Sequence, residues 1–345
     1  MEENTRQFDR ARAIEVSLTR RRRFREKLVH RFAKAIADYQ LVKPFDKIAV
    51  CISGGKDSML MAKLFQELKR RNKFPFELVF LVMDPGYHPE NRRKIESNAA
   101  LLDVPITVFE SDIFNSVVNV EKSPCYLCAR MRRGHLYKKA KELGCNKIAL
   151  GHHFDDVIET TLMSMLWGGQ IQTMMPKLHS TNFEGMELIR PMYYIREEDI
   201  IAWRDSNDLQ FLRCACRFTE KLENEAGDME SASKRKETKQ LIQLLKKTNP
   251  AVEANIFNSM HNVALDAVIA YKTKGEKHYF LDDYQEETML PNDPMILLSY
   301  INTKLRDDYS NLDMLCEDMQ ADRAEIEQKL AAADYKYDEK LNRFV

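Results

Sequence analysis

Ser53-Gly54-Gly55-Lys56-Asp57-Ser58 follows the β-branched run 47–52 and precedes the apolar stretch 59–65. The run before it reads as a buried strand, and the spacing after it is typical of a helix packed on a sheet. At such a junction, backbone N–H groups converge on the helix N-terminus, where the helix dipole favours negative charge. The stretch therefore predicts a loop that binds phosphate groups.

The residue types within this loop support that interpretation. The two glycines allow the backbone to approach phosphate oxygens, Lys56 adds a positive charge, and Ser53 and Ser58 add hydroxyl donors. Asp57 would repel phosphates unless a divalent cation lay between them, so we expect it to bind magnesium. A turn that uses glycine for geometry alone is the competing interpretation, and the complete string after a strand favours a nucleotide site.

Strand-like and helix-like segments alternate along the first half of the chain. This alternation predicts an α/β fold, a doubly wound and mostly parallel sheet with helices on both faces. The expected strands are 47–52, 77–83, 105–110 and 146–151, and a short one covers 210–212. The expected helices are 57–71, 89–102, 126–143 and 155–167.

Polar residues follow several of these strands. Asp84 follows the second strand, Gly151 and His152 follow the fourth, and Asp155 and Asp156 open the next helix. Ligands of parallel sheets bind outside the carboxyl ends of the strands, so we expect these residues beside the phosphate loop. Capping of the helix N-terminus is the alternative role for the two aspartates.

Composition bounds the remaining possibilities. The 53 Lys/Arg and 53 Asp/Glu residues cancel, and no run approaches the ~18 apolar residues of a membrane span. We therefore expect a cytoplasmic protein without a membrane segment, whose seven cysteines are reduced. Residues 1–35 hold 11 Lys/Arg against 5 Asp/Glu, whereas residues 281–345 hold 7 against 16.

These shifts suggest four regions. A basic amphipathic helix over 8–39 defines region 1–40, and its Arg20–Arg23 run is either a solvated face or an RNA contact. The predicted nucleotide-binding sheet occupies 41–218. A helical extension over 219–275 begins with a polar link and contains helices near 235–247 and 251–271. Region 276–345 is an acidic tail with a helix near 320–341.

Two cysteine motifs lie far apart in the sequence. Cys125 and Cys128 open a predicted helix, whose N-terminus favours thiolates, and Cys214-Ala215-Cys216 follows the expected strand 210–212. A redox dithiol, a structural zinc site with four cysteines and an iron–sulfur cluster with three cysteines all fit this pattern. Spacing alone does not separate zinc from iron. Cys51 and Cys145 are expected to be packing residues.

Several motifs occur in the order found in one known family. They are SGGKDS at 53–58, Cys125–Cys128 followed by Arg130-Met-Arg132-Arg133-Gly134, Ala149–Asp156, Leu188–Met192 and Cys214. Together they resemble the tRNA 2-thiocytidine biosynthesis (TtcA) family of the PP-loop ATP pyrophosphatases, over residues ~20–272. One difference is that the second cysteine motif is one residue shorter than Cys-x-x-Cys, which leaves Cys216 as an alternate ligand. The acidic tail is seldom present in that family.

The resemblance implies a tRNA sulfurtransferase that uses ATP and Mg²⁺ to adenylate the C2 oxygen of a tRNA pyrimidine, expected to be cytidine 32, and replaces that oxygen with sulfur. It implies a [4Fe–4S] cluster on Cys125, Cys128 and Cys214, and a persulfide donor such as a cysteine desulfurase. It leaves open a homodimer. The alternative is a PP-loop ATP ligase or thiolase that acts on another tRNA position or on a small molecule, with zinc on its cysteines.

Residue roles follow from the same resemblance. The catalytic candidates are Lys56, Asp57 and Asp156. The expected ATP-binding residues are Ser53, Gly54, Gly55, Lys56, Asp57, Ser58, Asp84, Gly151, His152 and Asp155. Asp84 would meet the ribose, and Gly151 with His152 would border the adenine. Arg130, Arg132 and Arg133 are the expected tRNA contacts, with a solvated helix face as the alternative.

Overall fold

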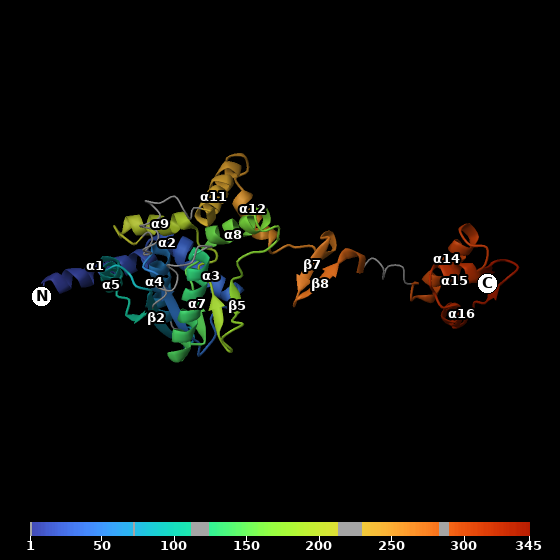
Figure 1. Cartoon of the computed structure of the whole chain (residues 1–345), viewed down its shortest axis with the longest axis horizontal. Helices are drawn as coiled ribbons and strands as arrows, with labels where there is room; N and C mark the ends of the chain where they lie inside the picture. The colour runs from blue at the N-terminus through green and yellow to red at the C-terminus, as the bar shows by residue number, and fades with distance from the viewer. Residues whose placement is uncertain (1, 72, 112–123, 213–229, 283–289) are drawn as a thin grey trace. The chain divides into compact units, whose positions relative to one another are not determined.

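The computed structural model describes residues 2–71, 73–111, 124–212, 230–282 and 290–345. The chain consists of two compact units, Met1–His261 and Asn262–Val345, which are described separately (Figure 1). No helix in the described ranges has the length and apolar character needed to cross a bilayer.

A six-stranded sheet forms the centre of the first unit. In chain order its strands are β1 (Lys47–Ile52), β2 (Glu77–Asp84), β3 (Ile106–Glu110), β4 (Lys147–Ala149), β5 (Lys177–His179) and β6 (Glu187–Ile189). Their order across the sheet is β3-β2-β1-β4-β6-β5, with β5 antiparallel to β6 and the other described pairs parallel. The predicted mostly parallel sheet is confirmed, and β5 and β6 are additions that the sequence pattern did not reveal.

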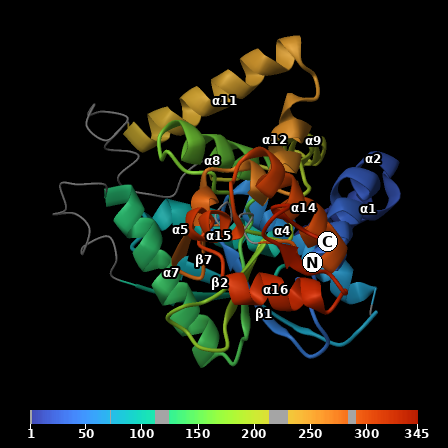
Figure 2. The same ribbon diagram turned by 90° about the vertical axis from the view of Figure 1, so that its right-hand side faces the viewer.

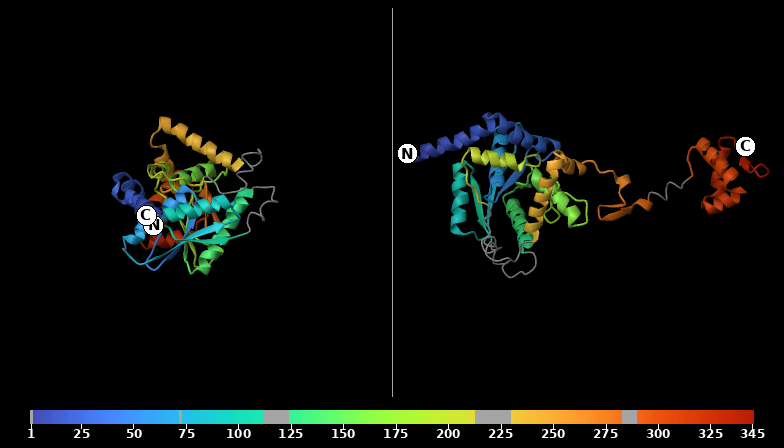
Figure 3. Two further views of the ribbon diagram at one scale, coloured as in Figure 1. Left: turned by 90° about the vertical axis from the view of Figure 1, so that its left-hand side faces the viewer. Right: turned by 90° about the horizontal axis from the view of Figure 1, so that it is seen from above.

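Helices cover both faces of this sheet, as predicted. Successive side chains of a strand point to opposite faces, so Ile48, Val50 and Ile52 join one core cluster while Ala49 and Cys51 join another. Helices α4 (Lys56–Arg70) and α5 (Pro89–Leu101) pack in the first cluster. Helix α7 (Pro124–Glu142) packs in the second, so β1 and β2 lie between helices (Figure 3).

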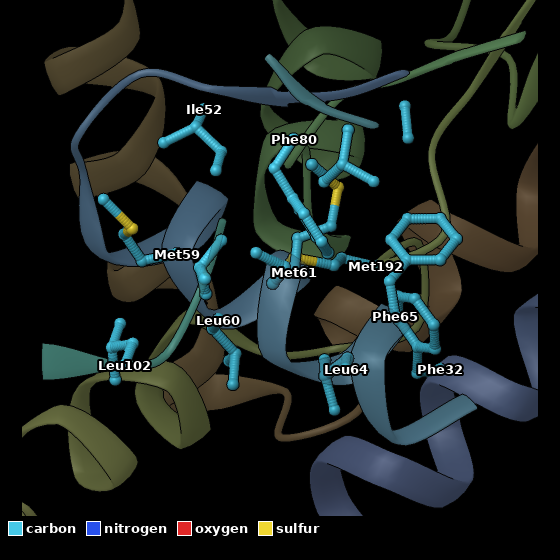
Figure 4. Packing of buried hydrophobic residues seen from close by; sticks show 14 of the residues in the cluster. Phe32, Ile52, Met59, Leu60, Met61, Leu64, Phe65, Phe80, Leu102 and Met192 are labelled. Carbon is cyan, nitrogen blue, oxygen red and sulfur yellow. The ribbon is translucent and has the colours of Figure 1, made fainter. Parts of the chain in front are cut away.

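Helix α4 is fixed by its apolar face. Met59, Leu60, Leu64 and Phe65 are almost fully buried, and the Phe65 ring meets that of Phe32 edge-on at a centroid distance of 5.1 Å (Figure 4). Because α4 begins at the loop after β1, this packing also fixes the direction in which the loop's N–H groups point.

The remaining elements of the first unit are helical. They are α1 (Glu2–Arg20), α2 (Arg22–Phe24), the π-helical η1 (Arg25–His30), α3 (Arg31–Asp38), α8 (Phe154–Leu166), α9 (Glu197–Ser206), α11 (Glu230–Thr248) and α12 (Val252–Ser259). The single helix predicted over 8–39 is therefore interrupted. The chain is extended at Arg21. Phe24 is then buried at the end of α2, and Leu28 and Val29 are buried in the π-helical η1. The Arg20–Arg23 side chains are exposed, and Arg22 pairs with Glu26 at 2.8 Å.

One expected element is absent from the described chain, and another is shorter than expected. Residues 210–212 form no strand, because the Leu212 N–H donates to the Gly54 carbonyl instead of a neighbouring strand. The helix expected over 251–271 ends at Ser259. Beyond it, η2 (Leu265–Ala267) is followed by a hairpin of β7 (Ala270–Thr273) and β8 (Glu276–Tyr279), whose turn uses positive φ at Lys274 and Gly275.

The second unit contains a folded helical domain with its own core. Its elements are α14 (Pro294–Asp307), α15 (Leu312–Asp318), α16 (Arg323–Ala331), β9 (Tyr337–Asp338) and β10 (Arg343–Phe344). Leu297, Ile301, Leu315, Leu330 and Phe344 are buried together. Acidic composition concealed this domain, since part of its acidity serves as helix N-caps at Asp293 and Asp322.

The cysteines expected to be packing residues are indeed buried. Cys51 and Cys145 lie in the cluster between the sheet and α7, and burial raises the pKa of the Cys51 thiol to about 12. Cys316 is buried in the core of the C-terminal domain. Burial of this kind makes a thiol inert rather than reactive.

Asn342 joins three parts of the C-terminal domain. Its amide donates to the carbonyl oxygens of Leu305 and Tyr309 at 3.0 and 2.9 Å, and its Oδ1 accepts from the Tyr337 hydroxyl at 2.7 Å. We predict that Asn342→Ala lowers the stability of this domain by ~1–2 kcal/mol, because the part-buried carbonyls of Leu305 and Tyr309 lose their donor. Calorimetry should show the domain's transition shifted down, with the first unit unaffected. Lys340→Ala, at an exposed position of the same hairpin, is the matched control; equal shifts for both variants would contradict the assignment.

Candidate functional site

The predicted phosphate loop forms a closed turn between β1 and α4. Gly54 has φ of +85°, and Gly55 is the N-cap of α4 in an extended conformation. The Ser58 hydroxyl accepts from the Ser53 N–H at 3.1 Å and donates to the Gly55 carbonyl at 3.0 Å. These bonds hold the loop in a shape that presents the first N–H groups of α4 outward.

Neighbouring segments press closely on the loop. A Cβ at Gly54 would lie 2.6 Å from Cγ1 of Ile95, in a backbone conformation that other residues rarely adopt. The Leu212 N–H bonds to the Gly54 carbonyl at 3.3 Å, and Asn98 donates to the Gln210 carbonyl at 3.0 Å. The segment 210–212 is thus fixed across the loop, directly before Cys214 and Cys216 in the sequence. Those two cysteines lie outside the described residues.

The segment after β4 reaches the same loop. A Cβ on Gly151 would lie 3.2 Å from the Ser58 nitrogen and 3.3 Å from the Asp57 carbonyl carbon. Gly151 therefore allows backbone to approach backbone at the start of α4. The structure thus brings together the loop and the Gly151–Asp156 stretch, which the sequence predicted to meet at the carboxyl edge.

Lys56 and Asp57 are held by charged neighbours. Lys56 Nζ lies 3.1 Å from Asp57 Oδ1 and 3.1 Å from Glu197 Oε1. Burial opposes the charge of Lys56, but Asp57 and Glu197 outweigh it and raise the pKa of Lys56. Asp57 Oδ1 is buried yet accepts no hydrogen bond. A buried carboxylate oxygen of this kind fits a magnesium ion, which takes oxygen ligands.

Asp155 and Asp156 have structural partners in addition to their predicted roles. His153 is the N-cap of α8 and forms a capping box with Asp156. Asp155 accepts from the Glu197 N–H at 2.7 Å and pairs with Arg196 at 3.1 Å, so it caps α9. His153 Nε2 lies 3.9 Å from Asp57 Oδ1 and 3.5 Å from Asp156 Oδ2, which places both aspartates around one imidazole.

Asp84 is buried at the end of β2, and His152 is partly exposed after β4. Asp84 Oδ1 accepts from the N–H groups of Gly86 and Tyr87 at 2.9 and 2.7 Å, and Oδ2 lies 3.2 Å from Arg92. These bonds shape the loop after β2. Burial, followed by the nearby positive charge of Arg190, lowers the pKa of His152 to about 4. His152 is consequently neutral near pH 7.

The expected RNA-binding arginines lie on α7. Arg130 and Arg133 are exposed, whereas Arg132 donates to the Tyr87 hydroxyl at 3.3 Å. Arg132 thereby ties α7 to the loop after β2. Cys125 and Cys128 fall in the first turn of α7, and their side chains lie outside the described part of the chain.

A cavity of about 880 Å³ lies beside the loop. Gly55, Lys56, Asp57 and Glu197 line it together with the segment 208–212 and part of α9. Its volume lies within the range of small-molecule sites, and its lining is polar at the lysine and the two carboxylates.

A set of charged partners was missed from the sequence. Helix α11 lies alongside α8 (Figure 2), with Arg235 2.9 Å from Asp156 and Lys239 2.5 Å from Glu197. Asp156 and Glu197 thus pair with basic side chains of a helix that lies some 40 to 80 residues away in the sequence. The available signal was the spacing of Arg235 and Lys239 by four residues, which puts both on one helix face.

Comparisons with known proteins agree with this geometry. The PP-loop domain family matches residues 24–218. A tRNA-cytidine(32) 2-sulfurtransferase of Francisella philomiragia is 38% identical over 244 residues, which are 69% of this chain and 90% of that protein. The Aliivibrio fischeri enzyme is 33% identical over 312 residues, 84% of this chain and 96% of that protein.

The chain belongs to the tRNA-cytidine(32) 2-sulfurtransferase family. The family resemblance inferred from the motifs is thereby confirmed, as is its PP-loop ATP-binding domain. The match to the Neisseria meningitidis sulfurtransferases, at 38% identity over 212 residues, spans 59% of this chain and 65% of their length. The relatives of this chain are therefore enzymes that thiolate tRNA.

A solved structure supports the fold. The U34-tRNA thiolase NcsA from Methanococcus maripaludis with its [4Fe-4S] cluster aligns with a TM-score of 0.53 and 20% identity, over 67% of this chain and 76% of that one. Separately, a domain of unknown function, DUF4250, matches residues 291–344. This sulfurtransferase family member thus carries a C-terminal domain that has its own family.

The packing at Gly54 generates a prediction for this family member. Gly54→Ala should lower the free energy of unfolding by ~1–3 kcal/mol, because the new Cβ meets Ile95 in an unfavourable φ region. Gly134→Ala is the matched control, since Gly134 lies within α7 with open space around it. That change should stabilise the protein by ~0.5–1 kcal/mol. Urea unfolding measures both values; a neutral Gly54→Ala would contradict the close contact.

Proposed function

We propose that this chain is an ATP-dependent sulfurtransferase that converts a tRNA cytidine, at position 32, to 2-thiocytidine. The observation that carries the proposal is the hydrogen bond between Leu212 and Gly54, since it ties the segment before Cys214 to the phosphate loop. Family membership and the PP-loop domain support the use of ATP and tRNA.

The first half-reaction transfers AMP. The cytidine C2 oxygen attacks the α-phosphorus of ATP, the bond to the bridging oxygen breaks, and pyrophosphate leaves. The N–H groups at the start of α4 and the Lys56 ammonium stabilise the charge on the phosphates. Asp57, together with Asp156, would hold Mg²⁺ against the same oxygens, and Asp57 Oδ1, whose described neighbour is the Lys56 ammonium at 3.1 Å, would exchange that ion pair for the metal. Gly151, whose backbone packs against the start of α4, and His152 would border the adenine.

The second half-reaction exchanges the ester oxygen for sulfur. Sulfide adds to C2 of the cytidine, the C2–O bond breaks, and AMP leaves with the oxygen. Cys125, Cys128 and either Cys214 or Cys216 would hold a [4Fe–4S] cluster, which would supply an iron able to bind sulfide. Three thiolates from two segments suit such a cluster, and the bond between Leu212 and Gly54, which holds the segment before Cys214 at the phosphate loop, supports the proposal.

The substrate and partners follow from this chemistry. Arg130 and Arg133, which are exposed, follow Cys128 on the same helix and would contact tRNA phosphates. A persulfide donor such as a cysteine desulfurase would supply sulfur, and a thiol reductant would release it as sulfide by being oxidised to a disulfide. The reaction requires reduced thiols, so we propose a cytoplasmic location. A homodimer is compatible with the proposal but is not required by it.

The cysteines provide the test of this function. Anaerobically prepared protein should absorb near ~400 nm, and Cys125→Ala and Cys214→Ala should lose this absorbance together with 2-thiocytidine formation. Mass spectrometry of tRNA nucleosides from a deletion strain complemented with each variant measures the product. Cys316→Ala, in the core of the C-terminal domain, is the control and should retain both signals. Colourless protein with stoichiometric zinc would refute the iron–sulfur assignment.

A further inference from the structure

Glu197 lies next to the lysine of the phosphate loop. Lys56 Nζ is 3.1 Å from Glu197 Oε1, and its other carboxylate neighbour is Asp57. An ammonium group has three N–H donors in a fixed tetrahedral arrangement. When two of them point to Asp57 and Glu197, the direction of the third is determined, and it remains for a phosphate oxygen.

Glu197 is itself fixed from two sides. Its Oε2 meets Lys239 of α11 at 2.5 Å, and its backbone N–H donates to Asp155 at 2.7 Å. Asp155 is in turn paired with Arg196. The side chains of Lys56 and Glu197 are 20% and 23% exposed, so both are mostly withdrawn from water. A carboxylate held in this way can orient a flexible lysine.

The charges are arranged to tolerate a phosphate ligand. Burial opposes the ionised form of Glu197, but Lys239 and Lys56 outweigh it and lower the pKa of Glu197 to about 2. The carboxylate is therefore ionised at neutral pH. The positive charge of Lys239 offsets the repulsion between the Glu197 carboxylate and the ATP phosphates. Glu197 can therefore orient Lys56 without weakening the binding of ATP.

We propose that Glu197 is a positioning residue that acts through Lys56, directing its ammonium at the leaving pyrophosphate, with Lys239 holding Glu197 in place. This inference rests on the proposed function, because it assigns a role in the same ATP site. Glu197 does not contact the reacting atoms itself. Glu197 contributes to the rate by orienting Lys56 as negative charge develops on the leaving pyrophosphate. It does not contribute by changing the net charge of the site.

A merely structural role is the competing explanation. Glu197 also connects α9 to α11 through Lys239, so its loss could loosen the unit without involving Lys56. The two explanations differ in additivity. A residue that acts through Lys56 has no further effect once Lys56 is removed, whereas a structural residue adds its own effect.

The test is a double-mutant cycle on the full-length, cluster-loaded protein. Pyrophosphate release is measured with Mg-ATP and tRNA for the wild type, Glu197→Gln, Lys56→Met and the double variant. We expect Glu197→Gln to lower kcat by about 10–100-fold, with KM for ATP within about threefold, because the ammonium charge stays while its direction is lost. In the Lys56→Met background, Glu197→Gln should cause no further fall.

Two matched controls accompany the cycle. Glu198→Gln is the control for Glu197→Gln, because it makes the same change at the adjacent, exposed position of α9. Lys236→Met, at an exposed position of α11, is the control for Lys239→Met. Both controls should match the wild type, and Lys239→Met should reproduce part of the Glu197→Gln defect. A Glu197→Gln variant as active as Glu198→Gln, or additive effects in the cycle, would overturn the inference. Wild-type protein that releases no pyrophosphate would instead refute the proposed function.

Calorimetric titration with Mg-ATP and with AMP gives a second readout that needs no turnover. AMP lacks the pyrophosphate that Lys56 addresses, so Glu197→Gln should leave the affinity for AMP unchanged. The wild type should bind ATP more tightly than AMP, and Glu197→Gln should keep its affinity for ATP within about threefold, since the ammonium charge stays. A parallel loss of affinity for both nucleotides would indicate general loosening of the unit and would reject the positioning role.

Discussion

The close approach of three backbone segments at two glycines is the constraint on which the site depends. Gly54 leaves no space for a side chain against Ile95, and Gly151 touches the start of α4. Since a Cβ would clash at Gly54 and would be tightly crowded at Gly151, glycine at both positions lets the loop, the segment after β4 and the segment 210–212 meet closely. Everything that this unit presents to a nucleotide follows from that meeting.

Around these two glycines, acidic and basic side chains form a network of ion pairs. Lys56 lies between Asp57 and Glu197, while Asp155 and Asp156 pair with Arg196 and Arg235. Buried charges are costly unless they are paired, so the network stabilises the site before any ligand binds. It also means that ligand phosphates and magnesium would compete with existing partners. The positions of α9 and α11 therefore shape the proposed nucleotide site, although neither belongs to its sequence motif.

The C-terminal domain follows separate rules. Its core of leucine, isoleucine and phenylalanine side chains is formed within residues 290–345, and Asn342 ties its last hairpin to α14. The same segment matches a domain family distinct from the PP-loop family. Its acidic side chains serve partly as helix caps, which explains how a segment of high negative charge is also well folded.

Local pattern was sufficient for β1–β4 and for α4, α5, α7 and α8, because burial on a sheet imposes a short-range periodicity that the sequence displays. The phosphate loop at 53–58 was equally predictable from the sequence, since its glycines and Lys56 are adjacent in the chain. Tertiary structure alone decided that residues 210–212 cross the loop instead of forming a strand, since the partner of Leu212 is a carbonyl some 160 residues away. It likewise decided that Glu197 contacts Lys56, because a charge pair between distant segments leaves no periodic trace.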